Sequence, residues 1–143
     1  MKAPASLGDL PRPVYFFDGH CVLCSAFVAF CLKRDPAGVL RFASAQSALG
    51  QRVLKALDLP EETLDRTILL LDGGEVYLRS TAVLRALNHL HGPVRWLQPL
   101  LGVPAFIRDP IYDVIARNRY RWFGRTATCF VPTPETRLRF IDL

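Results

Sequence analysis

The sequence predicts an α/β fold in which a four-stranded mixed sheet is flanked by helices. Three observations support this prediction: an unbroken apolar run at 14–17, an apolar segment of helical length directly after it, and two extended segments on either side of Asp72-Gly73-Gly74. An unbroken apolar run this short is typical of a strand buried on both faces. Two extended segments joined by an Asp-Gly-Gly turn are typical of a β-hairpin.

Hydrophobic period and stop signals assign the remaining elements. The helix at 21–34 ends at Asp35-Pro36, because the residue before a proline is disfavoured in helical conformation. The expected order is strand 14–17, helix 21–34, strand 40–43, helix 47–57, strands 67–71 and 75–79, a helix from Ser80 or Thr81 to about His91, and a last helix within 107–123, preceded by a hinge at 100–104. The first two strands flank a helix and should be parallel, whereas the hairpin strands are antiparallel. A βαβ unit followed by a ββα unit is the layout of the thioredoxin fold.

Length and composition predict a single domain. The chain has 143 residues, half of them hydrophobic, which is enough for one substantial core. No linker-like segment or repeat divides it. We therefore expect one thioredoxin-like domain over 1–143, with a core at about 13–92 and a C-terminal helical extension at 93–143.

Positive charge is concentrated near the C-terminus. The net charge is +5, and residues 117–143 hold six arginines against Glu135 and Asp142, which leaves +4 in that segment and +1 in the rest. Such a segment is either a solvated helix face or a surface for an acidic partner.

The sequence also bears on the compartment. The N-terminal residues lack the apolar region of a secretory signal. The longest nearly unbroken apolar run, 21–32, is shorter than the roughly 20 residues that a membrane-spanning helix needs. We expect a cytoplasmic protein with no membrane span. In a reducing compartment a close cysteine pair is more often catalytic or metal-binding than structural.

Cys21 and Cys24 stand one helical turn apart at the expected start of the first helix. At the helix N-terminus, unpaired N–H groups and the helix dipole stabilise a thiolate on Cys21. Cys24, one turn further on, is expected to be less exposed. An accessible thiolate followed by a shielded thiol suits two-step disulfide exchange.

Two other interpretations of the pair are open. A structural zinc site needs four ligands, and the remaining candidates are the widely separated Cys31 and Cys129 and the pair His89 and His91, which point to different sides of a helix. Plain core packing is the other alternative, and it suits Cys31. Cys129, in a loop-like stretch, is either an idle thiol or a third redox thiol.

Asp18 lies between the first strand and the cysteines. It is either an N-cap that accepts a backbone N–H or a proton acceptor for Cys24. A carboxylate disfavours a nearby thiolate, and a protonated His20 would oppose that effect.

The segment "DGHCVLC" resembles the DGxCxxC signature of the DCC family, thiol-disulfide oxidoreductases named for one Asp and two Cys. The segments 34–47, 80–84 and 107–125 resemble the family as well. The resemblance implies a thioredoxin-like fold and gives Asp18, Cys21 and Cys24 as the family's named residues. Thioredoxins carry a cis-proline before the third strand, and Thr67 stands near that place here.

The sequence therefore predicts a thiol-disulfide oxidoreductase in which Cys21 attacks and Cys24 resolves, with Asp18 as a third catalytic residue. Gly19, His20 and Thr67 are expected beside them. We expect no cofactor, no metal and no nucleic-acid partner; the substrate is an unidentified thiol or disulfide. The alternative is a non-enzymatic thioredoxin-like binding module with a basic C-terminal surface.

The segment 116–125 alternates arginines with aromatic residues. Ile107, Ile111, Ile115 and Trp122 fall close to one helical stripe, which predicts that this stripe packs on the domain. The arginines exceed what nearby acids can neutralise. We expect some of them to border the active site and raise its potential; the candidates are Arg117, Arg119, Arg121 and Arg125.

Overall fold

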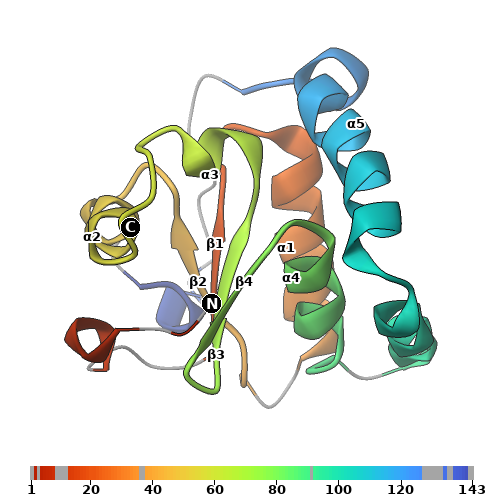
Figure 1. Ribbon diagram of the computed structural model, residues 1–143, viewed down its shortest axis with the longest axis horizontal. Helices are drawn as coiled ribbons and strands as arrows, with labels where there is room; N and C mark the ends of the chain where they lie inside the picture. The colour runs from red at the N-terminus through yellow and green to blue at the C-terminus, as the bar shows by residue number, and fades with distance from the viewer. Residues whose placement is uncertain are drawn as a thin grey trace.

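The computed structural model describes residues 2, 4–8, 13–35, 38–90, 92–126, 134 and 137–141. Its helices and strands follow the expected order (Figure 1). They are β1 (Val14–Phe17), α1 (Val22–Arg34), β2 (Arg41–Ser44), α2 (Ala48–Ala56), α3 (Thr63–Arg66), β3 (Leu69–Asp72), β4 (Glu75–Leu78), α4 (Arg79–Leu87) and α5 (Ala105–Phe123). Short 3₁₀ helices stand at η1 (Ala5–Leu7), η2 (Pro93–Gly102) and η3 (Arg137–Arg139).

The four strands form one mixed sheet in the order β2-β1-β3-β4. β1 and β2 are parallel, with Val14 opposite Arg41, while β1–β3 and β3–β4 are antiparallel. Gly73 and Gly74 both have positive φ values, 59° and 87°, which the tight turn between β3 and β4 requires. The expected α/β fold is confirmed, and the arrangement is consistent with a thioredoxin-like fold.

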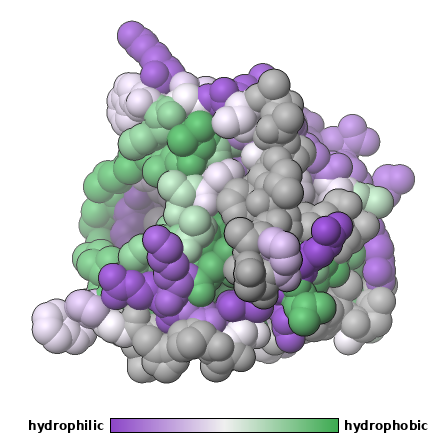
Figure 2. Space-filling view, turned by 180° about the vertical axis from the view of Figure 1, so that it is seen from behind, coloured by the Kyte–Doolittle hydropathy of each residue, from purple (hydrophilic) through white to green (hydrophobic). Residues whose placement is uncertain are grey.

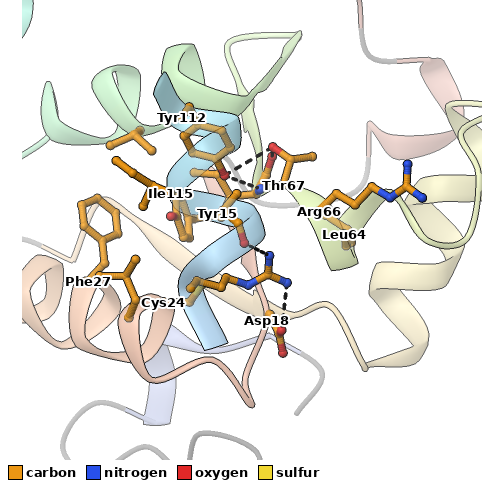
Figure 3. Close-up of a pocket in the computed structure, with 14 residues that line it drawn as sticks. Tyr15, Asp18, Cys24, Phe27, Leu64, Arg66, Thr67, Tyr112 and Ile115 are labelled. Atoms are coloured by element: carbon orange, nitrogen blue, oxygen red, sulfur yellow. Dashed lines mark hydrogen bonds and ion pairs between the residues drawn. The ribbon is translucent and has the colours of Figure 1, made fainter. Parts of the chain in front are cut away.

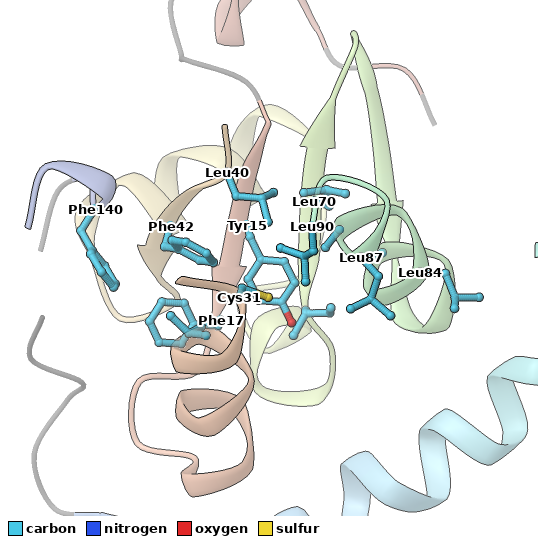
Figure 4. Close-up of a cluster of buried hydrophobic side chains, with 14 residues drawn as sticks. Tyr15, Phe17, Cys31, Leu40, Phe42, Leu70, Leu84, Leu87, Leu90 and Phe140 are labelled. Atoms are coloured by element: carbon cyan, nitrogen blue, oxygen red, sulfur yellow. The ribbon is translucent and has the colours of Figure 1, made fainter. Parts of the chain in front are cut away.

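Strands β1, β2 and β3 bury side chains on both faces of the sheet, whereas β4 buries only Val76. On one face, Tyr15 and Phe17 of β1 pack with residues of α1 and α4, and Figure 4 shows this cluster. On the other face, Val14 and Phe16 pack with residues of α2. Side chains alternate between faces along a strand, so a fully apolar β1 serves both cores. Figure 1 shows the resulting layers, with α2 on one side of the sheet and α1 and α4 on the other.

The segments outside the sheet differ more from expectation. α3 and the 3₁₀ helices are not predicted from the sequence, and the expected hinge at 100–104 is shorter because η2 runs to Gly102. α5 packs mainly against α4 and α1, and less extensively against α3. Lys2 forms an isolated bridge to Glu75 of β4, and Phe140 forms one to Phe42 of β2. Near the latter, buried Asp35 pairs with Arg139 at 2.6 Å.

Candidate active site

Cys21 is the N-cap residue of α1. Its φ and ψ, −83° and 121°, are extended, and its Sγ accepts a hydrogen bond from the Cys24 N–H at 3.2 Å. The Cys21 N–H donates to the Asp18 carbonyl oxygen at 3.2 Å. A cysteine sulfur thus occupies the place where Ser, Thr, Asp or Asn oxygen usually satisfies a free N–H at a helix start. The helix N-terminus therefore acts on Cys21 through a direct hydrogen bond.

The pKa values of the two thiols are shifted in opposite directions. Hydrogen bonding from the Cys24 thiol lowers the pKa of Cys21 to about 6, against the opposing effect of burial and with further help from the Cys24 N–H. The same hydrogen bond, together with burial, raises the pKa of Cys24 well above its ordinary value. The positive charge of Arg119 lowers the pKa of Cys21 more than the negative charge of Asp18 raises it. Cys21 is therefore the thiolate of the pair near neutral pH.

Cys21 is completely buried, whereas Cys24 is partly exposed, so the expected order of accessibility is wrong. The reason is a segment that follows α5 in the chain. Residues 124–126, which we call the covering segment, pair with the backbone around Cys21: Val22 N–H donates to Gly124 O at 3.3 Å, and Thr126 N–H donates to His20 O at 2.8 Å. An isolated bridge joins Cys21 to Arg125. The His20 Nδ1 also lies 3.0 Å from the Thr126 carbonyl oxygen.

Asp18 is 3% exposed and sits in a dense set of hydrogen bonds. Its Oδ1 accepts from the His20 N–H and from Gln46 Nε2, both at 2.9 Å. Its Oδ2 accepts from the Tyr120 hydroxyl and pairs with Arg119 at 3.4 Å. Because Cys21 is the N-cap of α1, the N-cap interpretation of Asp18 is wrong. The carboxylate instead joins the end of β1 to α5.

Two members of this network escape prediction from the sequence. Gln46 also accepts from the Gly19 N–H at 3.1 Å, so it fixes the turn before Cys21. Tyr120 stands out in the sequence only as part of an aromatic and basic stretch. The signal for Gln46 is its place within 34–47, one of the segments that resemble the DCC family, but nothing in its spacing to Asp18 indicates contact.

A half-open cavity of about 220 Å³ lies between β1, α1, α4 and α5. Figure 3 shows Cys24 and Phe27 from α1, Tyr15 from β1, and Tyr112 and Ile115 from α5 around it. Asp18, Thr67 and Arg119 also line it, whereas Cys21 does not. Thr67, just before β3, thus shares the cavity with Cys24.

Most of the predicted apolar stripe of α5 faces solvent, so the prediction that it packs on the domain is wrong except at Ile115, which lines the cavity although it is 40% exposed. Ile107, Ile111 and Trp122 are 49%, 63% and 54% exposed, while the side packed on the protein carries Ala116 and Arg119. Figure 2 shows hydrophobic side chains gathered on the side of the molecule where α5 lies. α5 is held by hydrogen bonds at this interface: Tyr112 Oη accepts from the Ile68 N–H at 3.1 Å, and Arg119 bonds to Asp18.

The four C-terminal arginine candidates lie in different places. Arg119 is buried, donates to the Ala116 and Asp65 carbonyl oxygens, and leaves its Nε as a buried nitrogen without a partner among the described residues. Arg125 is exposed and its guanidinium stacks over the Tyr120 ring at 5.2 Å. Arg117 donates to the Asp113 carbonyl oxygen of its own helix, and Arg121 is exposed.

Of the other cysteines, Cys31 is fully buried in the core, and burial raises its pKa to about 12. This confirms its expected place in the core. Cys129 lies outside the described residues. In the part of the chain that the structure describes, no three His, Cys, Asp or Glu side chains gather closely enough to hold a metal ion, and no helix there is long and apolar enough to cross a membrane.

A Cys-x-x-Cys pair at the start of the helix after β1, on a mixed four-stranded sheet, defines a thioredoxin-like protein with a paired-cysteine site. Within that class, the chain belongs to the DCC1-like thiol-disulfide oxidoreductase family, whose sequence model matches residues 15–125. The chain is 42% identical to the uncharacterized protein YuxK of Bacillus subtilis over 133 residues, which cover 93% of this chain and 96% of YuxK. It is 33% identical to a chloroplastic DCC family protein of Arabidopsis thaliana over 119 residues, which cover 82% and 69% of the two chains. No solved structure matches significantly.

Proposed function

We propose that this protein is a thiol-disulfide oxidoreductase in which Cys21 attacks a substrate disulfide and Cys24 resolves the product. The observation that carries the proposal is the hydrogen bonding at Cys21, whose Sγ accepts from Cys24 and whose pKa is lowered to about 6. A thiolate is the attacking species in disulfide exchange, and nucleophiles with a pKa near ambient pH are the most effective.

Two exchange steps complete the reaction. The Cys21 thiolate attacks one substrate sulfur, so a Cys21–substrate disulfide forms and the other substrate sulfur leaves as a thiolate. Cys24 then loses its proton and attacks the Cys21 sulfur, which forms the Cys21–Cys24 disulfide and releases the second substrate sulfur. The first step removes the negative charge from Cys21, and with it the stabilising hydrogen bond that keeps Cys24 protonated. Asp18, which lines the same cavity as Cys24, serves as the proton acceptor.

Access to Cys21 requires the covering segment to move. Within the described residues, backbone hydrogen bonds hold it beside Cys21, from the Val22 N–H to Gly124 O at 3.3 Å and from the Thr126 N–H to His20 O at 2.8 Å. A substrate that supplies its own backbone groups to His20 and Val22 would replace those bonds as it displaces the segment. This favours a peptide or protein disulfide as the substrate of Cys21.

Trapping tests the proposal. The Cys24→Ser variant should accumulate mixed disulfides through Cys21, because attack persists and resolution is lost. Cys31→Ser is the matched control, since Cys31 lies on the same helix but is buried in the core. Trapping by Cys21→Ser and not by Cys24→Ser would reverse the two roles.

A non-enzymatic binding module is the second candidate, favoured by the exposed apolar side chains of α5 next to exposed Arg117 and Arg121. Disulfide reductase activity distinguishes the two. Activity that vanishes in both Cys21→Ser and Cys24→Ser supports the enzyme, and a wild-type protein that reduces disulfides no faster than the uncatalysed reaction supports the binding module.

A further inference from the structure

The cavity beside Cys24 differs from the covered side of Cys21 in chemistry as well as in position. Its walls are mainly apolar, with Tyr15, Phe27 and Tyr112 among them. Burial raises the pKa of Tyr15 well above its ordinary value and also raises that of Tyr112, so both hydroxyls are neutral. Asp18 and Arg119 pair with each other at 3.4 Å. The part of a ligand that lies against these walls should be apolar and uncharged.

The volume of the cavity limits the size of the ligand. An apolar cavity of about 150 Å³ in another protein binds benzene. A cavity of about 220 Å³ therefore has room for one aromatic ring with a short substituent. The reactive group that such a ligand meets is the Cys24 sulfur, because Cys24 lines the cavity and Cys21 does not.

We propose that this cavity is the electron-donor site, which binds a small apolar thiol and directs its sulfur to Cys24 of the Cys21–Cys24 disulfide. The inference rests on the proposed function, which produces that disulfide. It assigns the two faces of the cysteine pair to two reactants: the substrate disulfide meets Cys21 and the reducing thiol meets Cys24.

The regenerating reaction has two steps. The donor thiol releases its proton to water, and the resulting thiolate attacks Cys24 Sγ. A donor–Cys24 disulfide forms, the Cys21–Cys24 bond breaks, and Cys21 leaves as a thiolate. A second donor thiolate then attacks the donor sulfur of this mixed disulfide, forming a donor disulfide and releasing Cys24, which takes a proton from water. Two donor thiols thus supply the two electrons that reduce the protein.

Site preference follows from leaving-group chemistry too. The sulfur with the lower pKa leaves faster in disulfide exchange. Attack on Cys24 expels Cys21 as a thiolate, which the Cys24 N–H and the Arg119 charge still stabilise after Cys24 has lost its thiol proton. The Arg119 charge lowers the pKa of both cysteines, so it also favours an incoming thiolate at this place. The step returns Cys21 directly to the form that attacks the next substrate.

The test compares two alkyl thiols of similar acidity as reductants of the oxidised protein. Benzyl mercaptan carries an aromatic ring that fits the cavity, whereas 2-mercaptoethanol has no ring to fill it. Reduction by benzyl mercaptan should be at least tenfold faster and should saturate with concentration. After acid quenching and alkylation during the reaction, mass spectrometry should find the benzyl adduct on Cys24 and the alkyl label on Cys21.

Cavity-filling variants make the test specific. Val83→Phe, from α4, should reduce the benzyl mercaptan rate to within about twofold of the 2-mercaptoethanol rate. Ile115→Phe fills the same cavity from a position that is 40% exposed, so it tolerates the larger side chain and serves if Val83→Phe does not fold. Val114→Phe is the matched control, because Val114 neighbours the cavity residues in sequence but does not line the cavity.

The outcomes separate this inference from the proposed function. Equal rates for the two thiols, a preference that survives in both filled variants, or a benzyl adduct on Cys21 would overturn the donor site alone. A protein that forms no Cys21–Cys24 disulfide on oxidation would overturn the proposed function and the donor site together.

Discussion

The helices α2 and α5 both carry apolar side chains at helical spacing, yet they use them in opposite ways. α2 buries its stripe, with Leu49, Val53 and Leu54 all less than 10% exposed. α5 turns Ile107 and Ile111 to solvent and packs on the protein through a side that holds Arg119 and Tyr112. α2 is thus held by hydrophobic burial, and α5 largely by hydrogen bonds and one ion pair that reach the cysteine site.

The difference shows what hydrophobic period decides. Apolar residues at helical spacing predict that a helix exists and which residues share a side. They predict which side is buried only where no other side of the helix makes stronger interactions with the rest of the protein, such as hydrogen bonds or an ion pair to a buried charge. In α5 the buried side supplies Arg119 and Tyr120 as partners of the Asp18 carboxylate. A buried carboxylate without such partners would destabilise the folded protein.

The largest effect should come from breaking the ion pair that anchors α5. Arg119→Met keeps the apolar stem but leaves Asp18 buried without its cationic partner, which we expect to lower the free energy of unfolding by about 3–5 kcal/mol. Urea denaturation followed by circular dichroism measures it.

Two further variants check that assignment. Arg121→Met, on the exposed part of α5, should change stability by less than about 0.5 kcal/mol. Combining Arg119→Met with Asp18→Asn should recover part of the loss, because the double change leaves no buried charge unpaired. Equal losses for Arg119→Met and Arg121→Met would show that the ion pair does not anchor α5.

Truncating the apolar stripes should separate the two helices clearly. Leu54→Ala in α2 removes a side chain that is 1% exposed and should cost about 2–5 kcal/mol. Ile111→Ala in α5 removes one that is 63% exposed and should cost less than about 0.5 kcal/mol. A loss at Ile111 of more than roughly 1.5 kcal/mol, which is the size of a core change, would mean that the stripe is buried in solution.

The covering segment offers a smaller effect on reactivity. Gly124 has a φ of 102°, which an L-residue rarely adopts, so Gly124→Ala strains the segment by roughly 1 kcal/mol. Iodoacetamide should then label Cys21 about fivefold faster, since 1.4 kcal/mol corresponds to about tenfold in an opening equilibrium. Gly73→Ala, at a positive φ in the distant hairpin turn, is the control, and an equal acceleration there would point to general loosening.

The pH dependence should show the smallest change. Labelling of Cys21 should rise with a midpoint near pH 6, the value to which hydrogen bonding from Cys24 lowers its pKa. Arg119→Met should move the midpoint upward by less than the Cys24 hydrogen bond does, and Arg121→Met should leave it unchanged. A midpoint at or above the free value of about 8.5 would mean that burial and Asp18 outweigh the hydrogen bonds.

The same pKa has a consequence for stability. Between pH 6 and the unfolded value of about 8.5, the folded protein binds fewer protons at Cys21 than the unfolded chain does. The stability that Cys21 contributes is therefore present above the unfolded pKa and is lost as pH falls through about 6. As pH rises through this window, the unfolding free energy of the wild-type protein should increase relative to that of Cys21→Ser. A flat difference would contradict a lowered pKa.

The sequence predicts much of the sheet and the position of the cysteines. The run at 14–17 coincides with β1, and the turn at 72–74 joins β3 and β4, because strand burial and turn geometry are local properties of the chain. The contacts that complete the site are not local. Asp18 meets Gln46 and Arg119 across 28 and 101 positions, and the covering segment reaches Cys21 from more than a hundred residues away. No period or spacing encodes such meetings.

Segments near the two ends of the described chain bridge the two edge strands of the sheet. Strands β2 and β4 form its edges, and each is bridged once by a terminal segment, at Phe42 through Phe140 and at Glu75 through Lys2. Unpaired edge strands are sites where copies of a protein join and aggregate. Edges only four residues long, each already bridged by its own chain, leave little length for such joining. The same bridges mean that a change at Lys2 or Phe140 acts directly on a sheet edge, where it would expose strand backbone to another copy of the protein.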